Sequence, residues 1–243
     1  MQCWGVTDAG CVRSQNQDIF QIVNLGKNAA VCIVCDGMGG AKSGNVASRL
    51  AAEVFMEEIA RTWTDGMDQA QIDQMLQGAV KLANFTVFDQ GKQFEEFSGM
   101  GTTLVAALIK DREATIVNVG DSRAYNINSH RIQKVTTDHS LVELMVQRGE
   151  LTREEARTYP GKNYITRAIG TETIVESDLF QLDMEWGDYL LLCSDGLTNV
   201  VDEQEILFEV IHGSSPEDCC QRLLDIAKMR GAPDNVTCVL VQI

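Results

Sequence analysis

The stretch "IVCDGMGG", residues 33–40, joins an apolar run to a single carboxylate, Asp36, and then to three glycines. The longer run "AAVCIVC" that leads to Asp36 is typical of a buried strand. An uncompensated carboxylate at the end of such a strand would cost several kcal/mol. We therefore expect a cation or strong hydrogen-bond donors to meet Asp36.

The segments before and after this stretch predict three strands followed by helices. Short runs rich in apolar and β-branched residues, bounded by Gly, Asn or Asp, predict strands at 3–10, 18–25 and 29–37. Apolar residues at helical spacing then predict helices at 43–62 and 71–91. Two long helices after three strands indicate a helical layer packed on a sheet.

The rest of the chain repeats this order. Short polar turns join four further strands into a predicted antiparallel meander, at 102–110, 113–121, 123–128 and 131–136. The last third adds two strands, two helices and a closing strand, at 178–184, 188–196, 203–212, 216–230 and 235–243. The order predicts an α+β fold, a β-sandwich of two antiparallel sheets flanked by pairs of antiparallel helices.

A polar segment interrupts the order between the meander and the last third. Residues 140–163 are helix-prone, lack a strong apolar face and are broken by Gly149, Pro160 and Gly161. We call residues 139–165 the flap segment and expect a small surface subdomain or lid, within a single domain that spans residues 1–243.

Charge and composition restrict the class of partner. The 243 residues include 35 acidic and 20 basic side chains, a formal charge of −15, which disfavours binding to nucleic acid or to an anionic membrane surface. No run approaches the roughly 20 apolar residues that span a bilayer, and the first residues lack the regions of a signal peptide. The chain is expected to be cytoplasmic, with a monomer as the default.

The cysteines favour free thiols over disulfides or a metal site. Several of the eight fall within apolar runs, where buried thiols are common in a cytosolic protein. Cys32 and Cys35 form a C-x-x-C pair, but residues three apart on a strand point to opposite faces, and no second pair with zinc spacing follows.

Four carboxylates share a position next to predicted strands, in the motifs "CDG" (35–37), "GDS" (120–122), "SDG" (194–196) and "PDN" (233–235). A single Asp-Gly is also typical of an Asx turn. Strand ends in one sandwich tend to cluster, and clustered acids repel one another unless cations intervene. Because no His accompanies these acids and Cys35 belongs to the apolar run of its predicted strand, oxygen ligands for Mg²⁺ or Mn²⁺ are favoured over a zinc or copper site.

A further motif, "RSQNQDIF" at 13–20, places Arg13 and Asp18 before a predicted strand. Arginine is suited to a bidentate hold on phosphate, although a solvated surface arginine is the alternative for Arg13 taken alone.

Taken in order, these motifs resemble one family over nearly the whole chain. The set comprises "RSQNQD", "CDGMGG", "GMGTTL", "VGDSRAY", "DHS", "NYITRAIGT", "LLCSDGLT" and "DNVTCVLV". It is similar to the bacterial form of the metal-dependent protein serine/threonine phosphatases of type 2C. The resemblance implies the same sandwich and two Mn²⁺ or Mg²⁺ ions bridged by Asp36. The Gly37 carbonyl would bind one ion, and Asp195 and Asp234 the other.

The same resemblance implies roles for four more residues. Asp18 would lie near the ion at Gly37, and Asp121 would help to hold a third, weaker ion. Arg13 would hold the substrate phosphate and act with Asp36 in catalysis. Asn235 would support the neighbouring metal ligand without binding an ion itself.

The expected activity is hydrolysis of phosphoserine and phosphothreonine in proteins by a metal-activated water, opposing a bacterial serine/threonine kinase. Two alternatives are a dinuclear phosphodiesterase or nuclease, which the acidic composition disfavours, and a pseudophosphatase, which would have lost a metal-binding acid.

Two positions depart from many eukaryotic relatives. Gln17 stands where they often carry an acid, and Met38 stands where many carry a histidine thought to protonate the leaving group. Since Met38 cannot donate a proton, we expect no essential histidine. His130 and His212 are expected to have solvated structural roles, and His139 to lie at the start of a flap helix capped by Asp138 or Ser140.

Overall fold

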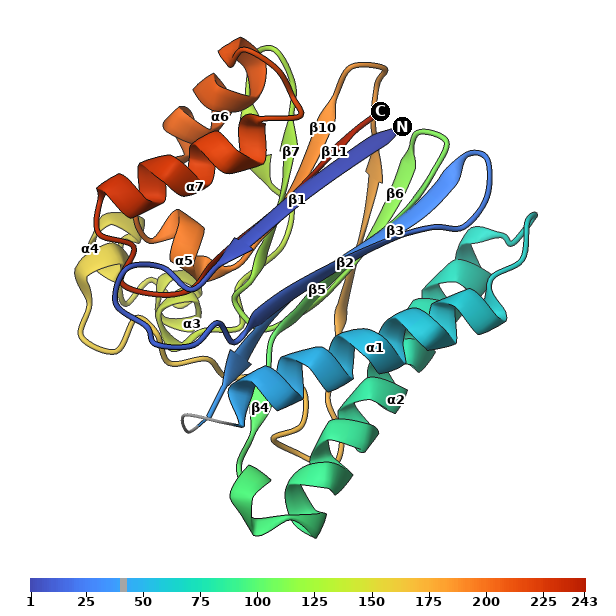
Figure 1. Cartoon of the computed structure of the whole chain (residues 1–243), viewed down its shortest axis with the longest axis vertical. Helices are drawn as coiled ribbons and strands as arrows, with labels where there is room; N and C mark the ends of the chain where they lie inside the picture. Colours follow the sequence, from blue (N-terminus) through green and yellow to red (C-terminus); the bar gives the residue numbers. More distant parts are fainter. Residues whose placement is uncertain (40–42) are drawn as a thin grey trace.

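Two packed antiparallel sheets form the centre of the molecule (Figure 1). The computed structural model describes residues 1–39 and 43–243, so Gly40 of the stretch 33–40 lies outside the described residues. The five-stranded sheet has the order β1 (Gln2–Asp8), β11 (Val236–Gln242), β10 (Tyr189–Cys193), β7 (Arg123–Ile127), β8 (Ile132–Lys134). The second sheet has the order β2 (Asp18–Asn24), β3 (Ala29–Met38), β5 (Leu104–Lys110), β6 (Glu113–Val119), β9 (Asp178–Asp183), and β4 (Gly101–Thr102) pairs with β3. This architecture confirms the predicted α+β sandwich.

Two helix pairs cover the outer faces of the sheets (Figure 1). On the sheet that contains β2 and β3 lie α1 (Gly44–Thr62) and α2 (Gln69–Gln93). On the sheet that contains β1 and β11 lie α6 (Glu203–His212) and α7 (Cys219–Met229), while the short α5 (Asp195–Thr198) follows β10 and η1 (Glu95–Phe97) follows α2. The helix pairs agree with the predicted segments.

Alternation along β3 separates two of the hydrophobic cores. Val31, Ile33 and Cys35 pack under α1 and α2, whereas Cys32 and Val34 point into the core between the two sheets. The prediction that the C-x-x-C pair faces opposite ways is thus confirmed, because side chains alternate along a strand. All eight cysteines lie within the described residues and are free thiols.

The predicted meander is wrong in one respect, because its strands divide between the two sheets. β5 pairs with β6 in one sheet and β7 pairs with β8 in the other. The chain crosses between the sheets at residues 120–122, where Gly120 has a φ of +110°. Turn length alone could not reveal this division, because a short connection joins strands in facing sheets as readily as neighbours in one sheet.

The flap segment contains two short helices, α3 (Leu141–Gln147) and α4 (Arg153–Thr158). Ser140, one of the two predicted caps, accepts a hydrogen bond from the Glu143 N–H at the start of α3 (3.3 Å). Most of the segment's side chains are exposed, and Glu143 is the buried exception in α3. Across the described ranges, no helix has both the length and the apolar character needed to cross a membrane.

Candidate active site

Asp36 and Asp18 face each other across the pair of strands β2 and β3. They are register partners in the antiparallel pair, so Asp36 lies within β3 rather than at its end, where the sequence pattern predicted it. Asp18 is buried, and its Oδ2 accepts a hydrogen bond from the Ser194 hydroxyl (2.7 Å). Its other oxygen, Oδ1, is buried with no hydrogen-bond partner among the described residues. This atom needs a proton or a cation to offset its burial.

The backbone around Asp36 is held on both sides. Thr103 Oγ1 accepts from the Asp36 N–H (3.0 Å), and the Asp36 carbonyl accepts from the Thr103 N–H (2.8 Å). Gly37 donates its N–H to the Gln17 carbonyl (3.1 Å), and a Cβ at Gly37 would lie 2.1 Å from the Gly44 carbonyl oxygen. Only glycine fits this close approach, so packing alone requires a glycine after Asp36.

The facing sheet contributes two more carboxylates. Asp195 begins α5, one residue after the end of β10, and its Oδ2 accepts from the Asn199 side-chain amide (2.9 Å). Asp234 lies in the turn before β11. The carboxylates of the opening stretch and of the last third are thus brought together by the packing of the two sheets, and the pKa of Asp36 responds to both Asp195 and Asp234.

Asn235 fastens the N-terminal loop to this end of the sandwich. Its amide nitrogen donates to the carbonyls of Ala9 (3.0 Å) and Gln15 (2.9 Å), and its Oδ1 accepts from the Gln17 N–H (2.9 Å). Its own N–H donates to Asp234 Oδ1 (2.9 Å). Asn235 therefore orients Asp234 and also fixes the loop that carries Arg13.

Arg13 lies over Asp234 at the surface. Its Nη2 donates to Asp234 Oδ2 at 2.8 Å, and the Arg13 side chain is 56% exposed. The hydrogen bond with Asp234 and its charge raise the pKa of Arg13, with Asp36 and Asp195 adding to the effect. Arg13 thus forms an ion pair with one of the clustered acids, Asp234, at the surface of the site.

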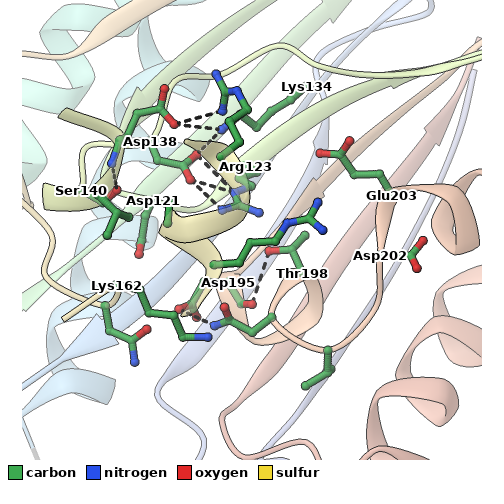
Figure 2. A pocket seen from close by; sticks show the side chains of 18 of the residues that line it. Asp121, Arg123, Lys134, Asp138, Ser140, Lys162, Asp195, Thr198, Asp202 and Glu203 are labelled. Carbon is green, nitrogen blue, oxygen red and sulfur yellow. Dashed lines mark hydrogen bonds and ion pairs between the residues drawn. The ribbon is translucent and has the colours of Figure 1, made fainter. Parts of the chain in front are cut away.

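Asp121 and Asp195 line a cavity of about 440 Å³ (Figure 2). The cavity lies between the flap segment and the start of α6, and cations from the flap segment, Arg153, Arg157 and Lys162, also line it. Deeper in its wall, Arg123 and Lys134 both bind the Asp138 carboxylate (2.7 and 3.0 Å), as the dashed lines of Figure 2 show. Asp138 is thus held by two cations and does not cap α3.

Four carboxylates of the site have raised pKa values: Asp18, Asp36, Asp121 and Asp195. Burial is the main cause, and it raises the pKa of Asp18 and of Asp121 to about 7. Burial also raises the pKa of Asp36 well above its usual range and raises that of Asp195, and neighbouring carboxylates add to both effects. Each acid therefore favours a nearby positive charge.

The donor set fits hard divalent cations. It consists of carboxylate and carbonyl oxygens, and the orphaned Asp18 Oδ1 lies beside Asp36 in the register of β2 and β3. Within residues 1–39 and 43–243, no three Asp, Glu, His or Cys side chains form a preformed cage around an ion. The fit consequently rests on the oxygen chemistry, the unpartnered atom and the mutual rise in pKa.

Sequence reasoning missed the neutral residues that support the carboxylates. Ser194 donates to Asp18, and Thr103 contacts both the Asp36 backbone and the Ser122 hydroxyl (2.7 Å). Ser194 and Ser122 adjoin the acids in "SDG" and "GDS", so a signal was present. Asn199 had no signal beyond its spacing of four residues from Asp195 on a helix.

Comparison with known proteins identifies the class to which this fold and site belong. The sequence profile described as protein phosphatase 2C matches residues 12–226. The chain therefore belongs to the protein phosphatase 2C family, whose members are metal-dependent protein phosphatases.

Bacterial relatives match it over nearly their whole length. The serine/threonine phosphatase stp of Listeria monocytogenes is 36% identical over 236 residues, covering 97% of this chain and 93% of that protein. The protein phosphatase PhpP of Streptococcus pneumoniae is 36% identical over 241 residues, covering 97% and 95%. The crystal structure of serine/threonine phosphatase Stp1 from Staphylococcus aureus has a TM-score of 0.94 and 38% identity, covering all of this chain and 94% of that one.

Proposed function

We propose that this protein phosphatase removes phosphate from phosphoserine and phosphothreonine in proteins, at the carboxylate cluster between the two sheets. The observation that carries the proposal is the gathering of acids from both sheets around Asp36, opposite an Asp18 whose buried Oδ1 has no partner among the described residues. The relatives named as serine/threonine phosphatases support the choice of substrate.

The carboxylates would hold two Mn²⁺ or Mg²⁺ ions. Asp36 would bridge them, with the Gly37 carbonyl on one side and Asp195 and Asp234 on the other, and Asp18 would lie close to the first. Such ions, when bound, polarise the phosphoryl oxygens and lower the pKa of the attacking water. Asp121, beside Asp195 in the cavity wall, would help to hold a third and weaker ion.

Arg13 would bind the substrate phosphate. Its guanidinium is exposed on a loop that Asn235 fixes, so it can turn from Asp234 toward a phosphate without disturbing the core. A bidentate contact with phosphate oxygens suits its planar geometry. Asn235 would keep both the loop and Asp234 in place and would not bind an ion.

The wider setting is proposed on the same basis. The chain would act as a single domain with a flap at about 139–165, in the cytoplasm and as a monomer. Its phosphoprotein substrates would be the targets of a serine/threonine kinase that it opposes.

The deciding experiment measures phosphate release from a phosphothreonine peptide by the purified full chain, with Mn²⁺ and then with a chelator. We expect turnover that requires the ion and is lost in Asp36→Asn. A folded protein that binds the phosphopeptide but releases no phosphate at any Mn²⁺ concentration would contradict the proposal and favour the pseudophosphatase alternative.

A further inference from the structure

His139 holds both polar groups of the backbone at Gly120, the residue before Asp121. The His139 N–H donates to the Gly120 carbonyl (2.9 Å), and the Gly120 N–H donates to His139 Nδ1 (3.0 Å). The His139 side chain is only 6% exposed, so water does not compete for these bonds. They fix the backbone from which the Asp121 carboxylate extends into the cavity.

The contacts of the imidazole determine its tautomer. Because Nδ1 accepts from a peptide N–H, the ring proton lies on Nε2, which donates to Asp178 Oδ2 at 3.1 Å. Arg167 Nη1 donates to the other Asp178 oxygen (2.9 Å) and so holds that carboxylate in place. The imidazole is therefore oriented from both of its nitrogens.

His139 is also where the two ends of the flap segment meet. The His139 carbonyl accepts from the Thr166 N–H (2.7 Å), and the Leu141 N–H donates to the Tyr164 carbonyl (2.8 Å). An isolated β-bridge between Ser140 and Ile165 lies between these bonds. The closed base of the flap segment and the turn that carries Asp121 thus share one residue.

The Gly120 turn depends on His139 for the contact of its N–H, whereas the Gly120 carbonyl also accepts from the Asn118 side-chain amide (3.3 Å). Its φ of +110° favours glycine, and a Cβ there would lie 2.6 Å from Thr103 Cγ2. The same Thr103 contacts Ser122 and the Asp36 backbone. A displacement of this turn would therefore move Asp121 directly, and would move the Asp36 backbone through Thr103.

We propose that His139 is a positioning residue for Asp121, and that it makes ion binding at Asp121 depend on the closed base of the flap segment. The proposal rests on the function proposed above, in which Asp121 holds the weaker ion. Residues that orient a metal ligand typically change metal affinity about 10–100-fold when they are replaced. His139 itself touches neither the carboxylates of the cluster nor Arg13 in the hydrogen bonds of the described residues.

Two substitutions separate the contacts of the ring. In His139→Asn, the amide oxygen can take the place of Nδ1 and accept from Gly120. In His139→Gln, the longer amide reaches toward Asp178 and cannot accept from Gly120 in the same way. His130→Gln, at an exposed histidine in the turn between β7 and β8, is the matched control.

The first test titrates Mn²⁺ into the full-length protein by calorimetry. We expect affinity at the weak site to fall about 10–100-fold in His139→Gln, to fall less in His139→Asn and to stay unchanged in His130→Gln. With saturating Mn²⁺, kcat of His139→Gln on a phosphothreonine peptide should stay within about tenfold of wild type, less than the loss of an essential general acid. If both folded His139 variants bind the weaker Mn²⁺ ion with the affinity of wild type, the proposal is overturned.

The second test needs no substitution at His139 and decides the matter if those variants do not fold. Nitrogen NMR of the wild-type protein should show the tautomer with the proton on Nε2, and the Gly120 amide should shift during the weak step of a Mg²⁺ titration. A proton on Nδ1 would overturn the proposal.

Asp121→Asn separates this proposal from the one on which it rests. If Asp121→Asn leaves the weak step intact, Asp121 is not an ion ligand and both proposals fail at this residue. If Asp121→Asn abolishes the step while the His139 variants keep it, only the role of His139 fails.

Discussion

At the scale of single residues, the carboxylate cluster costs the metal-free folded chain stability. Asp18 and Asp36 are opposite each other on paired strands, and like charges in that position repel. Burial and the neighbouring acids together raise the pKa of Asp36, so its charged form is costly in the folded chain. If the arrangement served the fold alone, replacing one of the acids would increase the stability of the metal-free protein.

We expect Asp36→Asn and Asp195→Asn to abolish turnover and to leave the metal-free protein no less stable than wild type. Each change removes an anionic ligand and also a source of repulsion. Phosphate release and circular dichroism measure the two effects. Near-normal Mn²⁺-dependent activity in either variant would contradict the assignment of these residues as ligands.

The same pKa shift predicts a pH dependence for Asp36→Asn without metal. A raised pKa means that folded Asp36 retains its proton where an unfolded Asp, with a pKa of about 3.9, has lost it. Stability is therefore lost as the pH rises above about 4, and Asn does not suffer this loss. In the presence of a chelator, the difference in melting temperature between Asp36→Asn and wild type should increase with pH. A difference that stays constant with pH would show that Asp36 does not titrate as the structure indicates.

Arg13→Ala should mainly raise KM. Loss of a charged hydrogen bond costs about 1.5–3 kcal/mol, which corresponds to a rise of roughly ten- to a hundredfold. Arg13→Lys keeps the charge but not the forked geometry, so its KM should lie between those of wild type and Arg13→Ala. Steady-state kinetics on a phosphothreonine peptide provide the measurement, and unchanged KM and kcat in Arg13→Ala would make Arg13 a surface residue only.

At the scale of elements, the two helices of the flap segment have charged contacts rather than an apolar core. Glu143 of α3 lies 3.4 Å from Arg153 and 3.9 Å from Lys134 of β8. None of the α4 side chains is buried. Such a segment opens more easily than the strands beneath it, because few apolar contacts resist the motion.

Exchanging residues 140–162 for the segment of a relative should change the preference among phosphopeptides far more than hydrolysis of a small aryl phosphate. The segment lines the cavity beside Asp121 and Asp195, where the peptide around the phosphate would lie. Kinetics on both substrate types measure the effect. Equal changes on the two substrates would argue against a role in selectivity.

A point substitution sharpens this prediction. Lys162 lines the cavity and forms no ion pair within the described residues. Lys162→Gln should raise KM for peptides with acidic residues near the phosphate and leave the aryl phosphate unaffected. Arg131→Gln, at an exposed cation in the turn between β7 and β8, is the control that should change neither.

At the scale of the whole molecule, the site joins the two sheets. Asp18 and Asp36 belong to one sheet, and Asp195 and Asp234 adjoin strands of the other. Ligands on both sheets would link the sheets through the ions, and anything that binds only the folded chain stabilises it. Ion binding should therefore stabilise the entire sandwich and not merely one loop.

Mn²⁺ at about 100 times its Kd should stabilise the protein by about 2.7 kcal/mol, which for a chain of this size corresponds to roughly 5–10 °C in Tm. Differential scanning calorimetry measures the shift, and a chelator should reverse it. Asp36→Asn should show little of it. An equal shift in wild type and in Asp36→Asn would place the stabilising ion elsewhere.

The local pattern of the sequence was sufficient for the long helices and most strands, but not for β4, η1 and α5. The period of two along β3 separated Cys32 from Cys35, and helical spacing located α1 and α2, because these signals depend only on neighbouring residues. Asp36, Asp121, Asp195 and Asp234 were singled out because each falls in a short motif next to a predicted strand, and Asp18 through the family resemblance.

Contacts between distant segments were decided by the tertiary structure alone. The division of the meander between two sheets, the pairing of Arg13 with Asp234, and the double hold of His139 on Gly120 join residues far apart in the chain. Local periodicity indicates which face of a strand is buried, but not which sheet or side chain will cover it. That choice depends on how two complete layers pack, because only the folded chain brings their strand ends, and the charges on them, within interaction distance.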